Sequence, residues 1–326
     1  MCKNISIESF PRIHITLIGM NNDGYRINGG IGFSIANPTI KIFFDTSIEI
    51  KINDERENKL TNNESNKLKY LLEKIKHENN LKFGISCKIE SVAFPHYGLG
   101  SGTIIYLSCV EALFLINNIS YEKEKIVNLS KRGGTSGIGI NTYFNGGFIF
   151  DVGIKRGNDS LIPDSIAERK GKLPLILKEI ILPDWKIGIC IPNFIKNKTE
   201  DEEKDFFNQS CPIDKSYILD ILYESLYGIT SSIIEKDYNV FCESINKIQK
   251  TRWKYLERNL YGKELFDLEN MIYKSGADCV GMSSLGPTLF FFGDDIDKII
   301  NNLLNNNDIE CFSTKLNNQS RKIVYA

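Results

Sequence analysis

The 326-residue chain has few of the residues that usually build zinc sites or disulfide frameworks. It contains three histidines, and its eight cysteines show no C-x-x-C spacing. Neither a structural zinc site nor a secreted disulfide scaffold is therefore expected. The cysteine usage fits the reducing cytosol, and the N-terminal residues do not resemble a signal peptide. We expect a cytoplasmic protein.

Long apolar runs and an excess of one charge are also missing. The longest apolar helix candidate, residues 104–116, contains Glu111 and is too short to span a bilayer. With 40 basic and 41 acidic residues the formal net charge is −1, so no global field draws the chain to nucleic acid or a membrane. We expect small-molecule partners, and neither nucleic acid nor membrane.

The pattern of apolar residues predicts two α+β domains, 1–183 and 184–326, with a boundary near Pro183. Expected helices cover residues 64–78, 102–116, 121–131, 215–250 and 263–274 and the segment DIDKIINNLL. Expected strands cover the segments GISCKIESVAF, FIFDVG, WKIGICIPN, ADCVGMSSLG, PTLFFFG and DIECFST. The acidic run EDEEKD at 200–205 is expected to be a solvated loop.

The first strand candidate, SIESFPRIHITLIGM, alternates apolar and polar side chains as a half-buried strand does. This alternation predicts two faces: Ile13, Ile15 and Leu17 on one, and Arg12, His14 and Thr16 on the other. Arg12 and His14 are therefore expected to share one face of this strand.

A glycine-rich stretch, FPHYGLGSGTII at 94–105, directly precedes the second helix candidate. Glycines allow close backbone approach, and the free N–H groups of a helix's first turn point at an anion. The stretch indicates a phosphate cradle; the alternative is a tight connection only. It is not a P-loop, because no lysine follows in the G-x-x-x-x-G-K pattern. It is not a dinucleotide fingerprint either, because Thr103 stands where the third glycine belongs.

The sequence contains two further glycine-rich stretches besides this loop. RGGTSGIGINTYFNGG at 132–147 precedes a strand, and GMSSLGPTLFFF lies between two strands near the C-terminus. The order of an R-x-H strand, a G-L-G-S-G helix start and a late S-S-x-G-P-T loop resembles the GHMP small-molecule kinase superfamily. The resemblance implies a two-domain, GHMP-kinase-like α+β fold, with a ribosomal-protein-like N-terminal domain and a ferredoxin-like C-terminal domain.

The superfamily's P-x-x-x-G-L-G-S-S-x motif wraps nucleotide phosphates. Five residues of this chain correspond to the motif: Pro95, Gly98, Leu99, Gly100 and Ser101. Gly102 stands in place of its second serine. Kinases of the superfamily usually need a carboxylate that orients or deprotonates the substrate hydroxyl, in several members within G-x-P-S-G-x-D. In the corresponding stretch, GGTSGIG, Gly139 occupies the place of the acid, and the nearest carboxylate, Asp151, does not fit the spacing.

One branch of the superfamily agrees with a glycine in place of the kinase carboxylate. The blocks RIHITLIGM, YRINGGIGFSI, HYGLGSGT, RGGTSGIG, GGFIFDVG and SSLGPT together resemble the β-ribofuranosylaminobenzene 5′-phosphate synthases of methanopterin biosynthesis. The resemblance implies that phosphoribosyl pyrophosphate reacts with 4-hydroxybenzoate or 4-aminobenzoate, releasing pyrophosphate and CO₂. It also implies an archaeal, Mg²⁺-dependent homodimer. The reaction needs no base at a ribose hydroxyl, which agrees with Gly139. The sequence names no protein ligand for the metal beyond Asp151 as a candidate.

The resemblance also nominates site residues. The catalytic candidates are Arg12, His14, Arg26, His96 and Arg132. A guanidinium fork suits phosphate or carboxylate oxygens, and the histidines would contact phosphate or the acceptor's para group. The alternatives are a solvated charge for each arginine and a structural role for each histidine. The substrate- and phosphate-binding candidates are Asn28, Gly29, Gly30, Gly98, Leu99, Gly100, Ser101, Gly102, Thr103, Gly133, Gly134, Thr135, Ser136, Gly137, Ser283, Ser284, Gly286 and Pro287.

Two other functions stay open at this point. One is an ATP-dependent GHMP kinase of a small alcohol or acid with a displaced base, which Gly139 disfavours. The other is a non-catalytic relative that retains the cradle as a sensor, which the intact arginines, histidine and glycine loops disfavour. The sequence does not separate hydroxybenzoate from aminobenzoate.

Overall fold

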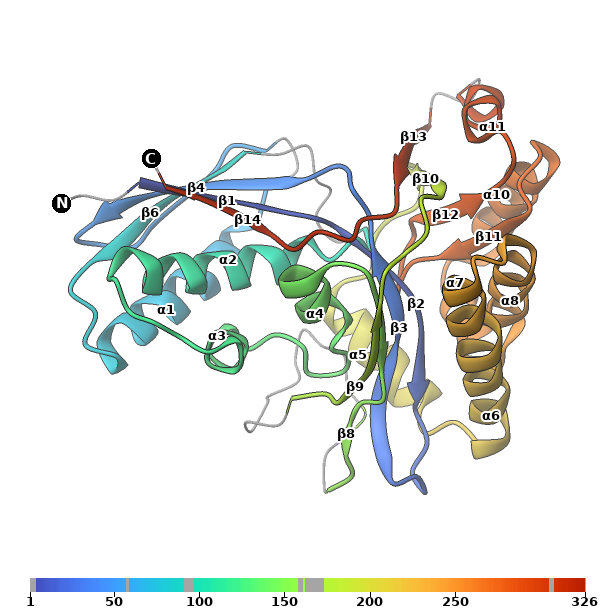
Figure 1. Ribbon diagram of the computed structural model, residues 1–326, viewed down its shortest axis with the longest axis horizontal. Helices are drawn as coiled ribbons and strands as arrows, with labels where there is room; N and C mark the ends of the chain where they lie inside the picture. The colour runs from blue at the N-terminus through green and yellow to red at the C-terminus, as the bar shows by residue number, and fades with distance from the viewer. Residues whose placement is uncertain are drawn as a thin grey trace.

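The computed structural model describes residues 4–56, 59–90, 97–157, 161, 173–304 and 308–325. The chain forms three sheets with helices packed around them (Figure 1). Among the described helices, none combines the length and the apolar character needed to cross a membrane.

The first sheet has the strand order β14-β1-β4-β6-β5. Its strands are β1 (Asn4–Ser9), β4 (Ile40–Ser47), β5 (Lys51–Asp54), β6 (Gly84–Glu90) and β14 (Lys322–Tyr325). Three helices accompany it: α1 (Asn62–Glu78), α2 (Ser101–Ile116) and α3 (Lys123–Ser130). Helix α2 is apolar on almost every side and packs on β1, β4 and β6, so it is the centre of this core.

The second sheet lies between the other two in Figure 1 and has the order β2-β3-β7-β9. Its strands are β2 (Arg12–Gly19), β3 (Arg26–Ser34), β7 (Phe148–Asp151) and β9 (Ile176–Ile180), and β8 (Ile154–Lys155) pairs with β3. Helix α4 (Ile138–Asn145) packs against β2, β3 and β7. The sheet therefore carries the predicted anion-binding strand next to the second glycine-rich stretch.

The third sheet is antiparallel and has the order β11-β12-β10-β13. Its strands are β10 (Lys186–Pro192), β11 (Cys279–Met282), β12 (Leu289–Phe292) and β13 (Ile309–Lys315). Its helices are α5 (Glu200–Ser210), α6 (Lys215–Tyr223), the π-helical η1 (Glu224–Thr230), α7 (Ser231–Glu235), α8 (Tyr238–Lys250), α9 (Arg252–Asn259), α10 (Gly262–Lys274) and α11 (Ile296–Leu303). The order strand, helices, two strands, helix, strand is the ferredoxin-like arrangement expected for this half.

The acidic run at 200–205 is helical, so the prediction of a loop is wrong. Helix α5 begins at Glu200, with Thr199 as N-cap, and Thr199 and Glu202 form a reciprocal capping box. The four acidic residues of the first turn also lie at the positive end of the helix dipole. The charge pattern suggested solvent, but its position after a threonine favoured a helix start.

Other elements also differ from the predicted ones, among them the segment SIESFPRIHITLIGM, which forms two strands, β1 and β2, in different sheets. Part of the second glycine-rich stretch forms helix α4, and residues 252–259 form helix α9. The last strand, β14, pairs with β1, so both ends of the chain meet at the first sheet (Figure 1). A domain boundary near Pro183 stays a prediction, and it separates β14 in sequence from the sheet that contains it.

A β-bulge changes which residues of β2 share a face. The pairing of β2 with β3 shifts between His14 and Thr16, so that His14 lies opposite Gly32 and Leu17 opposite Gly30. The prediction that Thr16 joins the polar face is therefore wrong, because the extra residue moves Leu17 onto it. Arg12, His14 and Leu17 form one wall, in this order along the strand.

Candidate active site

A cleft of about 230 Å³ lies between β2 of the second sheet and the helices that accompany the first and third sheets. Its walls come from β2, the N-terminal end of α2, the 132–140 segment, the 284–286 loop and helices α1, α5 and α9. The predicted site residues that line it are Arg12, His14, Gly98, Gly100, Ser101, Gly102, Thr103, Arg132, Gly133, Thr135, Ser136, Ser284 and Gly286. The structure thus brings together residues from four sequence blocks, the first at Arg12 and the last at Gly286.

The N-terminal end of α2 opens into this cleft. Gly98 and Gly100 adopt φ of 80° and 82°, which turns the chain sharply before Ser101 begins the helix. The Gly98 carbonyl accepts hydrogen bonds from the Arg12 guanidinium and from Ser283 Oγ (2.7 Å). Because the first N–H groups of a helix have no partner within it, this end attracts an anion. Binding of a phosphate at this helix end stays a prediction.

Replacing Gly98 by alanine should destabilise the protein more than a left-handed backbone alone explains. The new Cβ would lie 2.3 Å from the Ser283 carbonyl oxygen at a φ of 80°. We expect a loss of about 2–3 kcal/mol in the free energy of unfolding, measured by urea denaturation. The matched control is Gly262→Ala, which has φ 64° with no atom within 4 Å of its Cβ and should lose about 1 kcal/mol. Equal losses would contradict the importance of the Gly98–Ser283 contact.

Two arginines flank the helix end. Arg12 reaches Gly98, and its side chain also lies 3.1 Å from where a Cβ on Gly100 would be. The Arg132 guanidinium stacks over the Tyr106 ring at 4.0 Å, which orients it beside Gly102. Two cations and a helix N-terminus at one end of the cleft give that end a positive potential.

His14 is buried and held from three sides. Its backbone N–H donates to Ser283 Oγ (3.1 Å), its carbonyl accepts from the Ser284 N–H (2.8 Å), and its Nε2 lies 3.2 Å from Ser136 Oγ. Burial lowers the pKa of His14 well below its usual range, and the charges of Arg12 and Lys254 lower it further. Its buried Nδ1 has no hydrogen-bond partner within the described chain, so a second ring proton would have no acceptor. The imidazole is therefore neutral near pH 7.

This depressed pKa makes His14 a determinant of acid stability. The unfolded chain takes up a proton near the ordinary value of 6.5, which the folded chain resists. The stability that the neutral His14 contributes is therefore fully present above about pH 6.5, and it is lost as the pH falls below this value. We expect His14→Gln to flatten the fall measured by urea denaturation between about pH 7.5 and 5. The control His77→Gln, at an exposed position of α1, should keep the wild-type slope; an unchanged slope in His14→Gln would contradict the assignment.

Asp151, the sequence candidate for a base or metal ligand, binds backbone N–H groups with its carboxylate. It is fully buried and accepts hydrogen bonds from the N–H groups of Gly137 (2.5 Å) and Gly153 (2.7 Å). Its carboxylate thus fixes the turn that precedes α4 and does not line the cleft. Arg26 is also directed elsewhere, because its guanidinium donates to the carbonyls of Val152 (2.8 Å) and Gly153 (2.7 Å). The structure does not bring Arg26 to the cleft wall.

The remaining predicted residues fall into two groups. Those placed outside the lining are Asn28, Gly29, Gly30, Leu99, Gly134, Gly137, Ser283 and Pro287. Some of these form hydrogen bonds to lining residues. The Gly29 N–H donates to the Thr135 carbonyl (3.1 Å), and Ser283 Oγ accepts from the His14 N–H and donates to the Gly98 carbonyl. His96, with Pro95 of the motif, lies outside the described residues, so its assignment stays a prediction.

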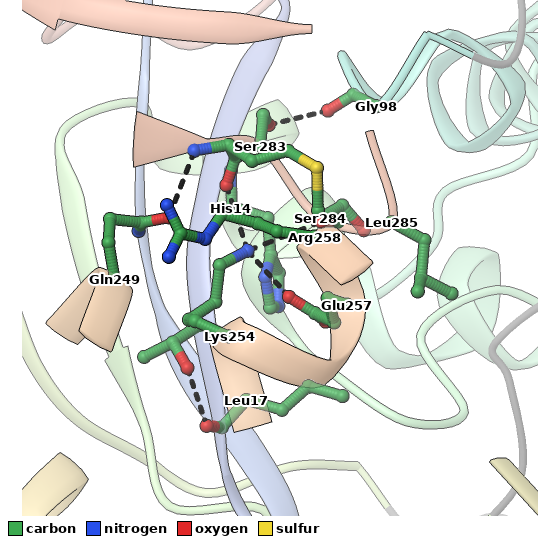
Figure 2. A network of polar contacts seen from close by, with 12 residues as sticks. His14, Leu17, Gly98, Gln249, Lys254, Glu257, Arg258, Ser283, Ser284 and Leu285 are labelled. Atoms are coloured by element: carbon green, nitrogen blue, oxygen red, sulfur yellow. Dashed lines mark hydrogen bonds and ion pairs between the residues drawn. The ribbon is translucent and has the colours of Figure 1, made fainter. Parts of the chain in front are cut away.

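A buried ion pair lies behind the late serine loop (Figure 2). Lys254 of α9 donates to the carbonyls of Met282 (2.9 Å) and Ser284 (3.3 Å), and its Nζ lies 2.5 Å from Glu257 Oε2. Burial lowers the pKa of Lys254 and raises that of Glu257, and each charge opposes the shift of the other. Glu257 reaches the cleft, so the pair connects the serine loop to the site.

Relatives of this chain carry a common name. A protein of Methanocaldococcus jannaschii named beta-ribofuranosylphenol 5′-phosphate synthase is 31% identical, over 97% of this chain and 99% of that protein. A protein of Archaeoglobus fulgidus with the same name is 30% identical, over 89% of this chain and 88% of that protein. This chain belongs to the β-ribofuranosylphenol 5′-phosphate synthase family. No model of a protein family matches it.

Solved structures identify the fold of this synthase family member. A putative sugar kinase from Campylobacter jejuni superposes with a TM-score of 0.70 at 14% identity, over 99% of this chain and 98% of that chain. Homoserine kinase from Cytophaga hutchinsonii gives 0.69 at 13% identity, over 98% and 97%. Mevalonate diphosphate decarboxylase from Staphylococcus aureus gives 0.67 at 14% identity, over 99% and 98%. The expected two-domain α+β fold of the GHMP kinases is confirmed.

Several cleft residues of the synthase family member were not anticipated from its sequence. Three apolar ones are Leu17, Phe207 and Leu285, and the charged ones include Lys67, Lys198, Glu200, Glu203 and Glu257. Glu200 and Glu203 belong to the acidic run that was expected to be a loop, and the T-x-x-E capping pattern was its available signal. Glu257 lies within RWKYLERN, which carries no motif.

The cleft can be tested for its fit to Mg²⁺. Within the described chain, no group of three or more His, Cys, Asp or Glu side chains is placed to hold a metal. Mg²⁺ usually takes one or two carboxylates and completes its shell with phosphate oxygens and water. Glu200 and Glu203 are three residues apart on α5, thus on one helix face, and both line the cleft. This donor set fits a Mg²⁺ that enters with a diphosphate.

Proposed function

We propose that the protein joins phosphoribosyl pyrophosphate to 4-hydroxybenzoate, with loss of pyrophosphate and CO₂, to give β-ribofuranosylphenol 5′-phosphate. This is a pentosyl transfer in an early step of tetrahydromethanopterin biosynthesis. The observation that carries the proposal is the match to the Methanocaldococcus jannaschii protein of that name along almost the full length of both chains. Because the relatives are named for a phenol, 4-hydroxybenzoate is favoured over 4-aminobenzoate as the acceptor.

The positive end of the cleft suits the leaving group of this reaction. Pyrophosphate leaves the anomeric carbon, which acquires oxocarbenium character, so the enzyme must stabilise growing negative charge on the diphosphate. The N-terminal end of α2, with the Ser101 and Thr103 hydroxyls, would receive the diphosphate, and Arg12 and Arg132 would neutralise it. A bound Mg²⁺, held through Glu200 or Glu203, would add Lewis-acid stabilisation of the same charge.

The acceptor supplies the electrons for the new bond. The ring carbon that bears the carboxylate attacks the anomeric carbon, and loss of CO₂ restores the aromatic ring. A para hydroxyl feeds electron density to that carbon, which explains why a para-substituted benzoate is needed. The neutral His14, fixed by Ser136 and Ser283 between the two ends, would line the path without adding a charge.

A GHMP kinase is the alternative function, and the site offers it less support. Gly139 occupies the position at which a kinase would carry its carboxylate, and it lies in the cleft wall beside Thr103. Asp151 is held by two backbone N–H groups and does not line the cleft. The similarity to solved kinase structures supports the fold and not a kinase activity.

The proposal also includes a homodimer working in the cytoplasm. The seven cysteines that the structure describes are free thiols, as a reducing compartment requires. Sedimentation equilibrium would measure the assembly, with twice the 37.1 kDa chain mass as the expected result.

The experiment that tests the proposed function measures pyrophosphate release. The protein is incubated with Mg²⁺ and phosphoribosyl pyrophosphate, with and without 4-hydroxybenzoate, and pyrophosphate is followed by a coupled assay. We expect release that requires both substrates. Release independent of the benzoate would indicate hydrolysis and contradict the proposal.

A further inference from the structure

The cleft has two chemically different ends, which β2 connects. Arg12, His14 and Leu17 follow one another on the cleft face of this strand. Their partners on β3, Ser34 and Gly30, are four residues apart, so at about 3.3 Å per residue Arg12 and Leu17 lie about 13 Å apart along the strand. The Arg12 end adjoins the N-terminal end of α2 through Gly98. The Leu17 end belongs to the apolar cluster that includes Trp253 of α9, and α9 packs against β2.

Glu257 of α9 lines the cleft near the Leu17 end. One turn before it, the Trp253 ring packs against the Phe207 ring at 5.5 Å. One turn after it, the Tyr261 hydroxyl donates to the Leu285 carbonyl. Phe207, Leu285 and Glu257 all line the cleft, so apolar side chains and this carboxyl group share one part of its wall. Leu17, Leu285, Glu257 and His14 all line the cleft, and Figure 2 draws them together with Lys254.

We propose that Glu257 binds the para hydroxyl of the aromatic acceptor, whose ring lies between Leu17, Phe207 and Leu285. The inference rests on the proposed function. A carboxylate accepts hydrogen bonds and donates none, so it selects a ring with a para donor. It also repels the acceptor's own carboxylate, which turns the reactive carbon towards Arg12 and the diphosphate.

Lys254 keeps Glu257 suited to this role. The ammonium group lies 2.5 Å from Glu257 Oε2 and is fixed by the carbonyls of Met282 and Ser284. Its side chain is fully buried, and that of Glu257 is 3% exposed. An ammonium in this position favours the ionised carboxylate against the cost of burial. Lys254 does not line the cleft and is therefore a positioning residue.

The assignment gives the proton a complete path. As the ring carbon bonds to the anomeric carbon, the bond from that carbon to the diphosphate oxygen breaks. The positive charge left on the ring is relieved when the para O–H passes its proton to Glu257. When the ring–carboxylate bond then breaks, its electron pair restores the aromatic ring and CO₂ leaves. Glu257 returns the proton to the para oxygen, so no other acid or base is consumed.

The test compares two ligands that differ by one hydroxyl. Dissociation constants for 4-hydroxybenzoate and benzoate are measured by calorimetry on wild type, Glu257→Gln and Glu64→Gln. A hydrogen bond to a charged group corresponds to about 10- to 150-fold tighter binding of 4-hydroxybenzoate by wild type. In Glu257→Gln we expect this ratio to fall to about threefold, with unchanged affinity for phosphoribosyl pyrophosphate. Glu64→Gln should keep the ratio: Glu64 also lines the cleft, and glutamine preserves its capping box with Thr61.

Each outcome decides between the two proposals. A wild-type ratio retained in Glu257→Gln overturns the assignment while leaving the proposed function standing. Failure of wild type to condense phosphoribosyl pyrophosphate with 4-hydroxybenzoate contradicts the proposed function itself. Should Glu257→Gln not fold, the double variant Lys254→Met/Glu257→Gln removes both buried charges and takes its place. The expected ratio in this variant is again about threefold.

Discussion

Replacing Gly139 by aspartate should abolish most of the affinity for phosphoribosyl pyrophosphate. Gly139 lies in the cleft wall, and a Cβ there would be 3.3 Å from Thr103 Cγ2 at the start of α2. A carboxylate at this place would face the diphosphate site and occupy the positive helix end itself. Like charges at about 4–5 Å with an effective dielectric near 20 repel by roughly 3–4 kcal/mol, or about 10²- to 10³-fold in affinity.

The control Gly139→Asn separates charge from bulk. Asparagine adds the same volume without a charge, and the neighbouring Thr103 side chain must shift by only a few tenths of an ångström. We expect a loss of at most about tenfold in affinity for phosphoribosyl pyrophosphate, measured by calorimetry with circular dichroism as the folding control. An aspartate variant that binds as tightly as wild type would contradict the position of the diphosphate. New ATP-dependent phosphorylation by that variant would support a kinase.

Replacing Lys254 by methionine should cause a large loss of stability. Methionine has a similar length but leaves the carboxylate of Glu257 buried without its counter-ion. Removing one partner of a buried pair costs about 3–5 kcal/mol. The loss is measured as the change in the free energy of unfolding in urea at neutral pH. Lys67→Met, which breaks the exposed pair with Glu200 at 2.9 Å, should lose only about 0–1 kcal/mol.

The double variant Lys254→Met/Glu257→Gln tests the cause of this loss. It leaves no buried charge, so it should recover most of the stability lost in Lys254→Met. If the double variant were as unstable as Lys254→Met, the loss would come from the hydrogen bonds of Lys254 to the serine loop. The uncompensated charge would then not be its cause.

The sequence predicted the residues that lie together at the Arg12 end of the cleft, because local motifs contain them. The G-L-G-S-G stretch and the R-x-H strand carry their chemistry in neighbouring residues, and the structure places Arg12, Gly98 and Ser101 together. The likeness to the synthase family rested on the same blocks. The family and fold could therefore be identified before any contact was known.

The other end of the cleft could not be predicted, for physical reasons. Leu17 reaches the cleft because of a bulge in β2, and strict alternation places it on the opposite face. Glu257 pairs with Lys254 and lines the cleft together with Leu285 and Phe207, an arrangement that only the packing of α9 creates. Composition and spacing do not report such long-range contacts.

The proposed function requires this cleft to make a carbon–carbon bond with loss of CO₂. The most direct measurement uses 4-hydroxybenzoate labelled in its carboxyl carbon, with phosphoribosyl pyrophosphate and Mg²⁺, and a parallel reaction containing ATP. We expect labelled CO₂ and pyrophosphate in equal amounts, a ribosylated phenol phosphate identified by mass spectrometry, and no ADP. Formation of ADP and a phosphorylated acceptor, with the label retained in the aromatic product, would contradict it.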